Sequence, residues 1–467
     1  MGEWFETRLS AYPLACPVAA THGLHSAAVK IAVIGAGWAG CAAAVEATRL
    51  GHQVVLFEAT RIAGGRARRV DAVVGGQPCT LDNGQHILIG AYTETLKLMA
   101  TLQVDATANL LRLPLTLQYP DASGLVLPRL RAPLNALAGM LTARGWSWRD
   151  KFSLLKLATG WQLRRFQCEA QLSVAQLCRQ ASPRVMATLI EPLCVSALNT
   201  PVARASGQVF LRVMQDALFS GGGASDLLLP RADLSALLPE AACAWLQRRG
   251  GEVRLGVRVD ALQQIPEGWM LAAGKPKTSP LPEAFDGIVL ACPATDAARL
   301  VGDSGVPAID WLAQAAALQY EPIATVYAFS PGVRLSQPML ALPSLEGLPA
   351  QFVFDRGQLN GPAGLLAFVI SASVGDGATL GQQVQAQAEA QLGLKKLEIV
   401  RTIVEKRATF ACTPGLQRPG MRIAPGTQPT LLACGDYVEG PYPATLEGAV
   451  RSGLAAARWL TQTGQLL

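Results

Sequence analysis

A glycine pattern between a strand and a helix constrains this chain more than any other feature. Residues 29–34 are a short run rich in β-branched side chains, typical of a buried parallel strand, and residues 35–40 read Gly-Ala-Gly-Trp-Ala-Gly. There Gly35 permits a tight turn, Gly37 lets the backbone approach a pyrophosphate, and Gly40 lets a helix over residues 41–50 pack closely on the strand. The helix N-terminus would offer its free N–H groups to the phosphates. The pattern predicts a dinucleotide-binding unit.

The next strand supports this prediction. Gly51 is suited to ending the helix, and residues 53–57 form a second apolar strand followed by Glu58. A carboxylate at the end of this strand can accept hydrogen bonds from both ribose hydroxyls of a bound dinucleotide. These residues alone leave NAD and FAD equally open.

A second glycine pair distinguishes FAD from NAD as the expected cofactor. Residues 64–68 read Gly-Gly-Arg-Ala-Arg and follow Glu58 closely. In this order, the motifs at 35–40, 57–59 and 64–68 resemble the flavoprotein superfamily of amine oxidases and carotenoid desaturases. The resemblance implies FAD as cofactor and places Gly64, Gly65 and Arg66 at its diphosphate. An arginine suits this position because its charge is permanent and its donor fork is planar.

The carboxy-terminal part of the chain resembles the other half of the same flavin site. Residues 430–434 are a buried-strand pattern that ends at Gly435 and Asp436, and the superfamily resemblance brings these two residues to the ribityl chain and phosphate. Residues 443–453 resemble the closing helix, whose first N–H groups face the flavin pyrimidine. A helix N-terminus stabilises the negative charge of reduced flavin.

The separation of these halves predicts a discontinuous fold of the α/β class. Residues 251–259 and 288–291 look like strands that return to the cofactor sheet. We therefore expect a Rossmann-like FAD-binding domain from residues 29–110, 225–300 and 413–467. A mixed sheet and helical substrate domain would consist of residues 111–224 and 301–412. Residues 1–28 are expected to be a disordered extension, because they contain no convincing secretory signal.

One further segment narrows the family. Residues 81–92 read Leu-Asp-Asn-Gly-Gln-His-Ile-Leu-Ile-Gly-Ala-Tyr, and with residues 443–453 they resemble the squalene-associated FAD-dependent desaturases over residues 30–465. This resemblance implies reductive dehydroxylation of hydroxysqualene to squalene in hopanoid or isoprenoid lipid biosynthesis. A carotenoid or phytoene desaturase is the main alternative. An amine oxidase is less favoured, because the superfamily's amine site places an aromatic residue where this chain has Thr445. A flavin-bound lipid carrier without chemistry is least favoured.

The resemblance and the local chemistry together name candidate site residues. The proton donor for the departing hydroxyl would be Asp82, His86, Glu447, Tyr437 or Tyr442, and His86 leads because an ordinary histidine pKa lies nearest neutrality. Val259 is expected against the adenine. The full set of expected cofactor contacts is Gly35, Ala36, Gly37, Trp38, Ala39, Gly40, Glu58, Gly64, Gly65, Arg66, Gly84, Gln85, His86, Val259, Gly435, Asp436, Thr445 and Leu446.

Composition bounds the environment and the partners. Hydrophobic residues make up 50% of 467 residues, which suits a long apolar isoprenoid substrate, yet no apolar run reaches the length of a membrane span. The net charge of +6 gives no reason to expect nucleic-acid binding. Ten scattered cysteines and four histidines lack metal-ligand spacing, so we expect no metal and a reducing, cytoplasmic location. No second nucleotide motif identifies the electron donor, which stays open.

Residues 125–168 have an unusual charge distribution. Asp150 is their one acid, and Trp146, Trp148, Phe152 and Trp161 are interleaved with the basic residues. Tryptophan with lysine and arginine is typical of a membrane interface, so peripheral contact with the inner face of the membrane is one interpretation. An ordinary helical lid with solvated cations is the other. The eight basic residues are Arg129, Arg131, Arg144, Arg149, Lys151, Lys156, Arg164 and Arg165.

Overall fold

The computed structural model describes residues 28–130, 134–219, 223–273, 280–424, 426 and 430–463. The predicted disordered extension, 1–28, therefore lies outside the described residues apart from Ala28. Arg131 of the basic segment also lies outside them.

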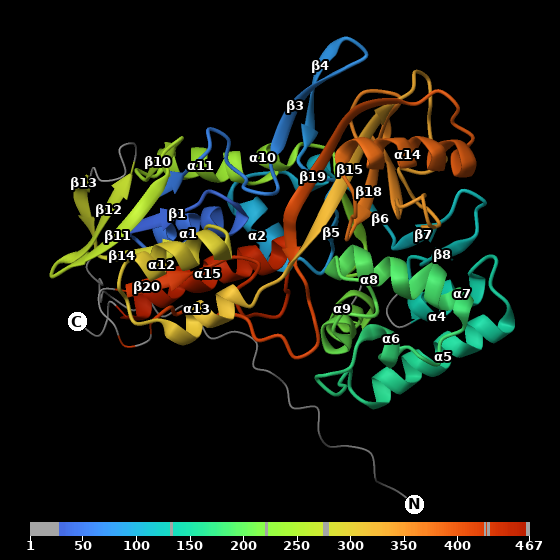
Figure 1. Ribbon diagram of the computed structural model, residues 1–467, viewed down its shortest axis with the longest axis horizontal. Helices are drawn as coiled ribbons and strands as arrows, with labels where there is room; N and C mark the ends of the chain where they lie inside the picture. The colour runs from blue at the N-terminus through green and yellow to red at the C-terminus, as the bar shows by residue number, and fades with distance from the viewer. Residues whose placement is uncertain are drawn as a thin grey trace, which may run out of the picture.

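A five-stranded parallel sheet confirms the predicted α/β class (Figure 1). Neighbouring strands in this sheet come from distant parts of the chain, and every pairing is parallel. Buried apolar residues dominate the central strands, as expected where both faces of a sheet are covered. In spatial order the strands are β10 (Glu252–Leu255), β2 (Gln53–Glu58), β1 (Lys30–Ile34), β14 (Gly287–Leu290) and β20 (Thr430–Ala433).

Two helices from opposite ends of the chain pack together beside this sheet (Figure 1). Helix α1 (Trp38–Arg49) begins inside the glycine pattern, three residues earlier than predicted, and its residues through Ala47 are buried. Helix α15 (Leu446–Thr463) approaches it closely, because a Cβ added at Gly453 would lie 2.1 Å from the carbonyl oxygen of Ala39. Glycine is thus required for this contact.

Smaller elements surround the parallel sheet. An antiparallel three-stranded sheet contacts the amino-terminal ends of β1 and β14, and a hairpin projects from the chain after β2 (Figure 1). These elements are β3 (Arg69–Val74), β4 (Gln77–Asp82), α2 (Thr93–Thr101), α3 (Ala106–Asn109), α10 (Leu234–Leu237), α11 (Pro239–Arg248), β11 (Val259–Ile265), β12 (Gly268–Ala273), β13 (Pro280–Phe285), α12 (Ala294–Asp303) and α13 (Ile309–Ala316).

A second, antiparallel sheet stands beside the parallel one, with helix α14 against it (Figure 1). Its order is β16 (Met339–Ala341), β17 (Phe352–Asp355), β18 (Leu365–Ser371), β15 (Tyr320–Phe329) and β19 (Glu398–Phe410). The remaining elements of this half are β5 (Leu88–Ile89), β6 (Leu110–Leu113), β7 (Thr116–Gln118), β8 (Gly124–Val126), β9 (Leu227–Pro230), the 3-10 turn η2 (Arg356–Gln358) and α14 (Gly377–Leu392).

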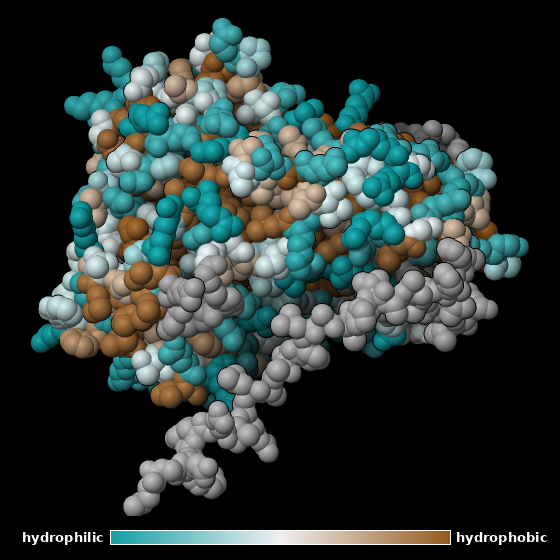
Figure 2. All heavy atoms as spheres, turned by 180° about the vertical axis from the view of Figure 1, so that it is seen from behind, coloured by the Kyte–Doolittle hydropathy of each residue, from teal (hydrophilic) through white to brown (hydrophobic). Residues whose placement is uncertain are grey.

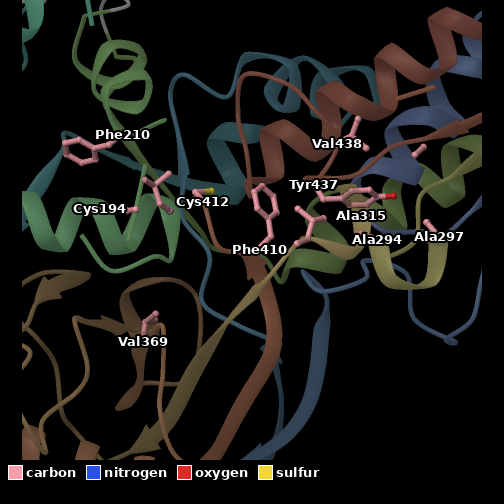
Figure 3. Packing of buried hydrophobic residues seen from close by; sticks show 14 of the residues in the cluster. Cys194, Phe210, Ala294, Ala297, Ala315, Val369, Phe410, Cys412, Tyr437 and Val438 are labelled. Carbon is pink, nitrogen blue, oxygen red and sulfur yellow. The ribbon is translucent and has the colours of Figure 1, made fainter. Parts of the chain in front are cut away.

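A group of helices completes the second half (Figure 1). It consists of α4 (Leu134–Thr142), α5 (Trp148–Leu163), α6 (Val174–Leu177), α7 (Pro183–Val185), the π-helical turn η1 (Met186–Ile190), α8 (Glu191–Leu198) and α9 (Gly207–Phe219). One apolar cluster runs without interruption from these helices to the cofactor half, from Phe210 through Phe410 to Tyr437 (Figure 3). This shared core marks no division between two domains, so the domain boundaries predicted from the sequence stay a prediction.

Candidate functional site

A cavity of about 660 Å³ lies where the two halves meet. Its size is within the range of small-molecule sites. Among the predicted cofactor contacts, only Ala36 and Gly40 do not line it. The fold therefore brings together segments that are distant in the sequence, and the cavity is the candidate active site.

The glycine turn forms one end of this cavity. Gly35 has a φ of +113°, which favours glycine, and a Cβ there would lie 2.7 Å from the carbonyl oxygen of Ala291. The second glycine segment lies directly against the first, since Gly64 donates its N–H to the Ala36 carbonyl at 2.8 Å. A Cβ added at Gly65 would be 3.4 Å from the Cα of Gly37. Two side-chain-free backbones thus form a cradle that suits a diphosphate.

Glu58 closes this cradle from the end of β2. Its buried carboxylate accepts the backbone N–H of Ala36 at 2.9 Å, and its other oxygen accepts the N–H and hydroxyl of Thr60, both at 2.9 Å. Glu58 therefore fixes the turn itself in addition to lining the cavity. Each carboxylate oxygen can accept more than one hydrogen bond, so the predicted ribose contact is compatible with these partners.

Arg66 and Asp436 were predicted independently as cofactor contacts, and the fold places them together. Arg66 Nη2 donates to Asp436 Oδ1 at 2.5 Å, and Arg66 Nη1 donates to the Ala408 carbonyl at 2.6 Å. Both side chains line the cavity. The guanidinium is held at the wall by a carboxylate from 370 residues further along the chain. This pair joins the two sequence halves of the site.

Tyr437 places a phenol hydroxyl without a hydrogen-bond partner among the described residues. Its ring is buried within the shared core beside Phe410 (Figure 3), and it also lines the cavity. The hydroxyl is buried and has no hydrogen-bond partner in the part of the chain that the structure describes. Burial raises the pKa of Tyr437 well above its usual range, so the phenol stays protonated. An orphaned donor at a glycine cradle fits a bound nucleotide cofactor.

The closing helix also faces the cavity. Thr445 precedes α15, where its hydroxyl accepts the N–H of Gly448 at 3.0 Å and donates to the Tyr442 carbonyl at 2.9 Å. Thr445 and Leu446 both line the cavity. The start of α15, with its positive dipole end, therefore lies at the cavity wall, and its contact with the flavin stays a prediction.

His86 lines the cavity, but its environment opposes the predicted role as a cationic proton donor. Burial, reinforced by the charge of Arg66, lowers the pKa of His86 to about 4. The imidazole is therefore neutral near pH 7. This pKa direction argues against a partly cationic His86, because burial first and the charge of Arg66 second both disfavour the imidazolium, and neither could be read from the sequence.

Asp82 is not placed to protonate a substrate. The carboxylate does not line the cavity and is almost completely buried. One oxygen accepts the N–H of Leu234 at 2.8 Å, at the start of α10, and the other lies 4.0 Å from Arg356. Burial raises the pKa of Asp82 to about 6, against the opposing effects of Arg356 and the Leu234 hydrogen bond. Its position indicates a structural role.

Glu447 is likewise corrected from a catalytic to a structural residue. It is fully buried outside the cavity, and its carboxylate accepts the N–H groups of Glu94 and Thr95 at 3.0 and 2.9 Å. The Thr95 hydroxyl and Arg451 Nε also donate to it, at 2.7 and 2.6 Å. These partners make Glu447 the cap of helix α2, whose own preceding residue provides no side-chain cap.

A polar group on the wall contributed by α9 was missed in the sequence. Asp216 lines the cavity together with Tyr442 and Tyr92, and its carboxylate accepts a hydrogen bond from Arg212. The Arg212 Nε to Asp216 Oδ2 distance is 2.7 Å. Burial first, and then the charge of Asp216, raise the pKa of Tyr442. Asp216 is the one acid of α9, where the sequence pattern is that of an ordinary amphipathic helix with a polar side, so no local signal could have singled it out.

Much of the remaining cavity wall is apolar. It comes from helices α8 and α9, from strands β5, β9, β15, β17 and β18, and from the loop before β7, so a hydrocarbon could occupy this end. The principal apolar lining residues are Ile87, Ile89, Leu115, Leu193, Ala197, Val213, Met214, Leu227, Ile323, Phe352, Phe354 and Val369.

Comparison with known proteins agrees with this geometry. The profile of the family described as flavin containing amine oxidoreductase matches residues 38–460. A hydroxysqualene dehydroxylase from Rhodopseudomonas palustris is 29% identical, over 93% of this chain and 98% of its own length. A 15-cis-phytoene desaturase from Glycine max is 25% identical, over 94% of this chain and 80% of its own length.

A solved structure with the same architecture is an oxidoreductase from Methanosarcina mazei. It superposes with a TM-score of 0.69 at 16% identity, covering 92% of this chain and all of that one (100%). At this identity the likeness shows the fold alone.

Proposed function

Because the chain belongs to the flavin-containing amine oxidoreductase family and is an FAD-dependent oxidoreductase, we propose that it reduces hydroxysqualene to squalene. The observation that carries the proposal is the near-full-length similarity to the Rhodopseudomonas palustris hydroxysqualene dehydroxylase. The apolar end of the cavity supports it, since a thirty-carbon isoprenoid needs an apolar enclosure. The reaction would serve hopanoid or other isoprenoid lipid synthesis.

The glycine cradle would hold the cofactor at its diphosphate. The Gly37 and Gly65 backbones and Arg66 would contact the phosphates, Glu58 the adenosine ribose and Val259 the adenine. Asp436 would orient Arg66, and the Tyr437 hydroxyl would gain a partner. When bound, reduced FAD supplies the hydride that replaces the substrate's hydroxyl group. These assignments follow the family resemblance and the lining of one cavity.

The chemistry requires a proton at the departing oxygen. The allylic carbon–oxygen bond breaks, water leaves, and a carbon–hydrogen bond forms at the same carbon. We assign the proton to Tyr442, which lines the cavity and keeps its proton near neutral pH because its pKa is raised. Proton transfer leaves a phenolate, and the nearby guanidinium of Arg212, which donates to Asp216, would offset that charge.

The walls would protect the developing allylic cation. Aliphatic lining residues such as Leu193 and Val213 cannot add to the cation, and they would exclude water from this end. Neutral His86 would not repel the positive charge, whereas a cationic imidazole would. His86 is thus better suited to contact the cofactor than to donate the proton.

Anaerobic single turnover tests the proposal. The purified protein, with its flavin reduced by dithionite, is mixed with hydroxysqualene while flavin absorbance is followed, and the product is identified by mass spectrometry. We expect reoxidation of flavin with formation of one squalene per flavin oxidised. Reduced flavin that stays reduced, with no squalene formed, would overturn the proposal.

The Glycine max relative makes a phytoene-type desaturase the second candidate. Desaturation runs in the opposite redox direction, because the oxidised flavin accepts hydride from an isoprenoid. Mixing oxidised protein with phytoene under the same conditions distinguishes the two. Bleaching of oxidised flavin, with a new conjugated double bond in the product, would establish desaturase activity. If hydroxysqualene also gave no reaction, the proposed dehydroxylase activity would be excluded.

A further inference from the structure

The helices farthest from the cofactor sheet present an exposed apolar surface. Six large side chains form it, and we call it the α4–α5 face: Leu134, Leu137 and Leu141 on α4, and Trp148, Phe152 and Leu155 on α5. Trp148 is 65% exposed and Phe152 is 63% exposed. Figure 2 shows hydrophobic atoms gathered at the lower left, the side on which α4 and α5 lie when the view of Figure 1 is turned. Clustered exposure of this kind indicates an interaction site.

The spacing of these residues puts them on one side of each helix. Positions 134, 137 and 141 are separated by three and four residues, and positions 148, 152 and 155 by four and three. The opposite side of α5 packs inward, where Leu157 and Trp161 are buried and the Trp161 ring lies 6.1 Å from that of Phe210. Helix α5 therefore has two apolar sides, of which one serves the core and one does not.

Basic side chains surround the α4–α5 face. Lys151 bridges the two helices, since its Nζ donates to the Leu141 carbonyl at 2.6 Å and lies 5.2 Å from the centroid of the Trp148 ring. Arg144, Arg149 and Lys156 are exposed around it. The rim therefore carries a concentration of positive charge.

The one acid of residues 125–168 does not neutralise this rim. Asp150 turns into the helix start, where it accepts the Ser147 N–H at 2.8 Å and the Ser182 hydroxyl at 2.6 Å. Outside the segment, Asp121 accepts a hydrogen bond from the Ser123 hydroxyl in the loop before β8. A second copy of the chain is a poor occupant, because self-association would bring two basic rims together.

We infer that the α4–α5 face docks onto the surface of a bilayer containing anionic phospholipid. Trp148 and Phe152 would enter the boundary between headgroups and acyl chains, and the basic rim would contact the phosphates. Among the described helices, none is both long and apolar enough to cross a membrane. The docking is therefore peripheral, and it does not depend on the proposed reaction.

The position of the α4–α5 face relates the docking to substrate entry. The carboxy-terminal end of α5 contacts helix α9 through Trp161 and Phe210, and α9 contributes Val213 and Met214 to the cavity wall. Helix α9 therefore connects the helix that carries the docked surface to the apolar end of the cavity. Docking would bring this side of the molecule to the bilayer in which an apolar substrate dissolves.

Vesicle co-sedimentation of the FAD-loaded protein tests the inference. We expect binding to vesicles of equal phosphatidylcholine and phosphatidylglycerol, and binding at least about tenfold weaker to phosphatidylcholine alone. The variant Arg149→Glu/Lys156→Glu should bind the anionic vesicles at least about tenfold more weakly, and Trp148→Ser/Phe152→Ser about tenfold more weakly. Raised salt should weaken binding of the unmodified protein.

Matched substitutions elsewhere serve as controls. Ile309→Ser/Val374→Ser removes two side chains that are 81% and 87% exposed, and Lys395→Glu/Lys396→Glu reverses two exposed charges outside the face. Both should bind like the unmodified protein. Bound-flavin absorbance and thermal unfolding confirm that each variant is folded; if the serine pair unfolds, the charge pair alone decides.

Three results would overturn the inference. The first is equal binding to neutral and anionic vesicles, and the second is unchanged binding by the charge variant. The third is that the unmodified protein binds no vesicles but self-associates, and that the Trp148→Ser/Phe152→Ser variant abolishes this self-association. The last result would identify the α4–α5 face as an interface between two copies.

Discussion

The dinucleotide end of the cavity is made of backbone, whereas the substrate end is made of side chains. At the first end, two glycine segments approach so closely that a Cβ at Gly65 would lie 3.4 Å from the Gly37 Cα. At the second end, apolar residues from α8, α9, β15 and β17 form much of the wall, and the polar side chains of Tyr442 and Asp216 interrupt it. One end has its shape fixed by local conformation, and the other by the packing of distant elements.

This difference predicts different tolerance to substitution. A backbone cradle has no side chain to yield, so an added methyl group must displace the chain itself. A side-chain wall can adjust its packing, and there only the loss of a specific polar group should matter. Substitutions at the dinucleotide end should therefore impair cofactor retention first, whereas substitutions at the substrate end should impair turnover first.

The largest effect is expected at the dinucleotide end. In Gly40→Ala the new Cβ would lie 1.8 Å from the Gly35 carbonyl oxygen and 2.9 Å from the Ala291 Cβ, so α1 must move away from the turn. We expect the protein to purify without FAD and to lose about 1–3 kcal/mol or more of unfolding free energy. Flavin absorbance and denaturant unfolding measure both quantities.

A helical glycine in open space is the matched control. Nothing lies within 4 Å of a Cβ at Gly302, on α12, so Gly302→Ala should retain FAD and gain roughly 0.5–1 kcal/mol. Full FAD retention by Gly40→Ala would show that the cradle is not rigid.

An intermediate effect is expected at the substrate end. Tyr442→Phe should keep FAD and fold normally but lose about a hundredfold in the single-turnover rate with hydroxysqualene, because the proton donor is removed. Tyr119→Phe is the control, since Tyr119 is buried outside the cavity and donates to the Thr188 carbonyl at 3.3 Å. An undiminished rate in Tyr442→Phe, with a hundredfold loss in His86→Ala, would return the role to His86.

The smallest effect concerns His86, which lies between the two ends. Its folded pKa of about 4 lies below the ordinary value of 6.5, so the unfolded chain takes up the proton first as the pH falls. Protonation therefore destabilises the protein progressively between about pH 6.5 and 4, and has no effect above that window. His86→Asn should lose on the order of 2 kcal/mol less on acidification than the unmodified protein, less than the full shift implies because the ring is partly exposed.

Asp82 should respond with the opposite sign in the same pH window. Its folded pKa of about 6 lies above the ordinary 3.8, so proton uptake as the pH falls stabilises the folded state. Asp82→Asn should then lose more stability than the unmodified protein between pH 6 and 4. Thermal unfolding of both variants across this range measures the two slopes, and equal slopes would contradict the assignment.

The contrast between the two ends also explains what the sequence could predict. The strand, glycine turn and helix at 30–49 depend on local conformation, which a sequence pattern records directly. Arg66 and Asp436 could each be named from a motif, but their pairing required the fold. Glu447 was mistaken for a candidate acid because its partners, the N–H groups of α2, are more than 350 residues away. Asp216 had no motif at all.

The order of strands in the parallel sheet has a consequence for synthesis of the protein. Strand β20 and helix α15 are made last, and Asp436 leaves the ribosome 370 residues after Arg66. At about 5–20 residues per second, roughly 20–70 s pass before the partner of α1 exists. During that time β2 and α11 can already cover part of α1, but the side that faces α15 stays uncovered. We therefore expect a chain that stops before residue 436 to retain no flavin.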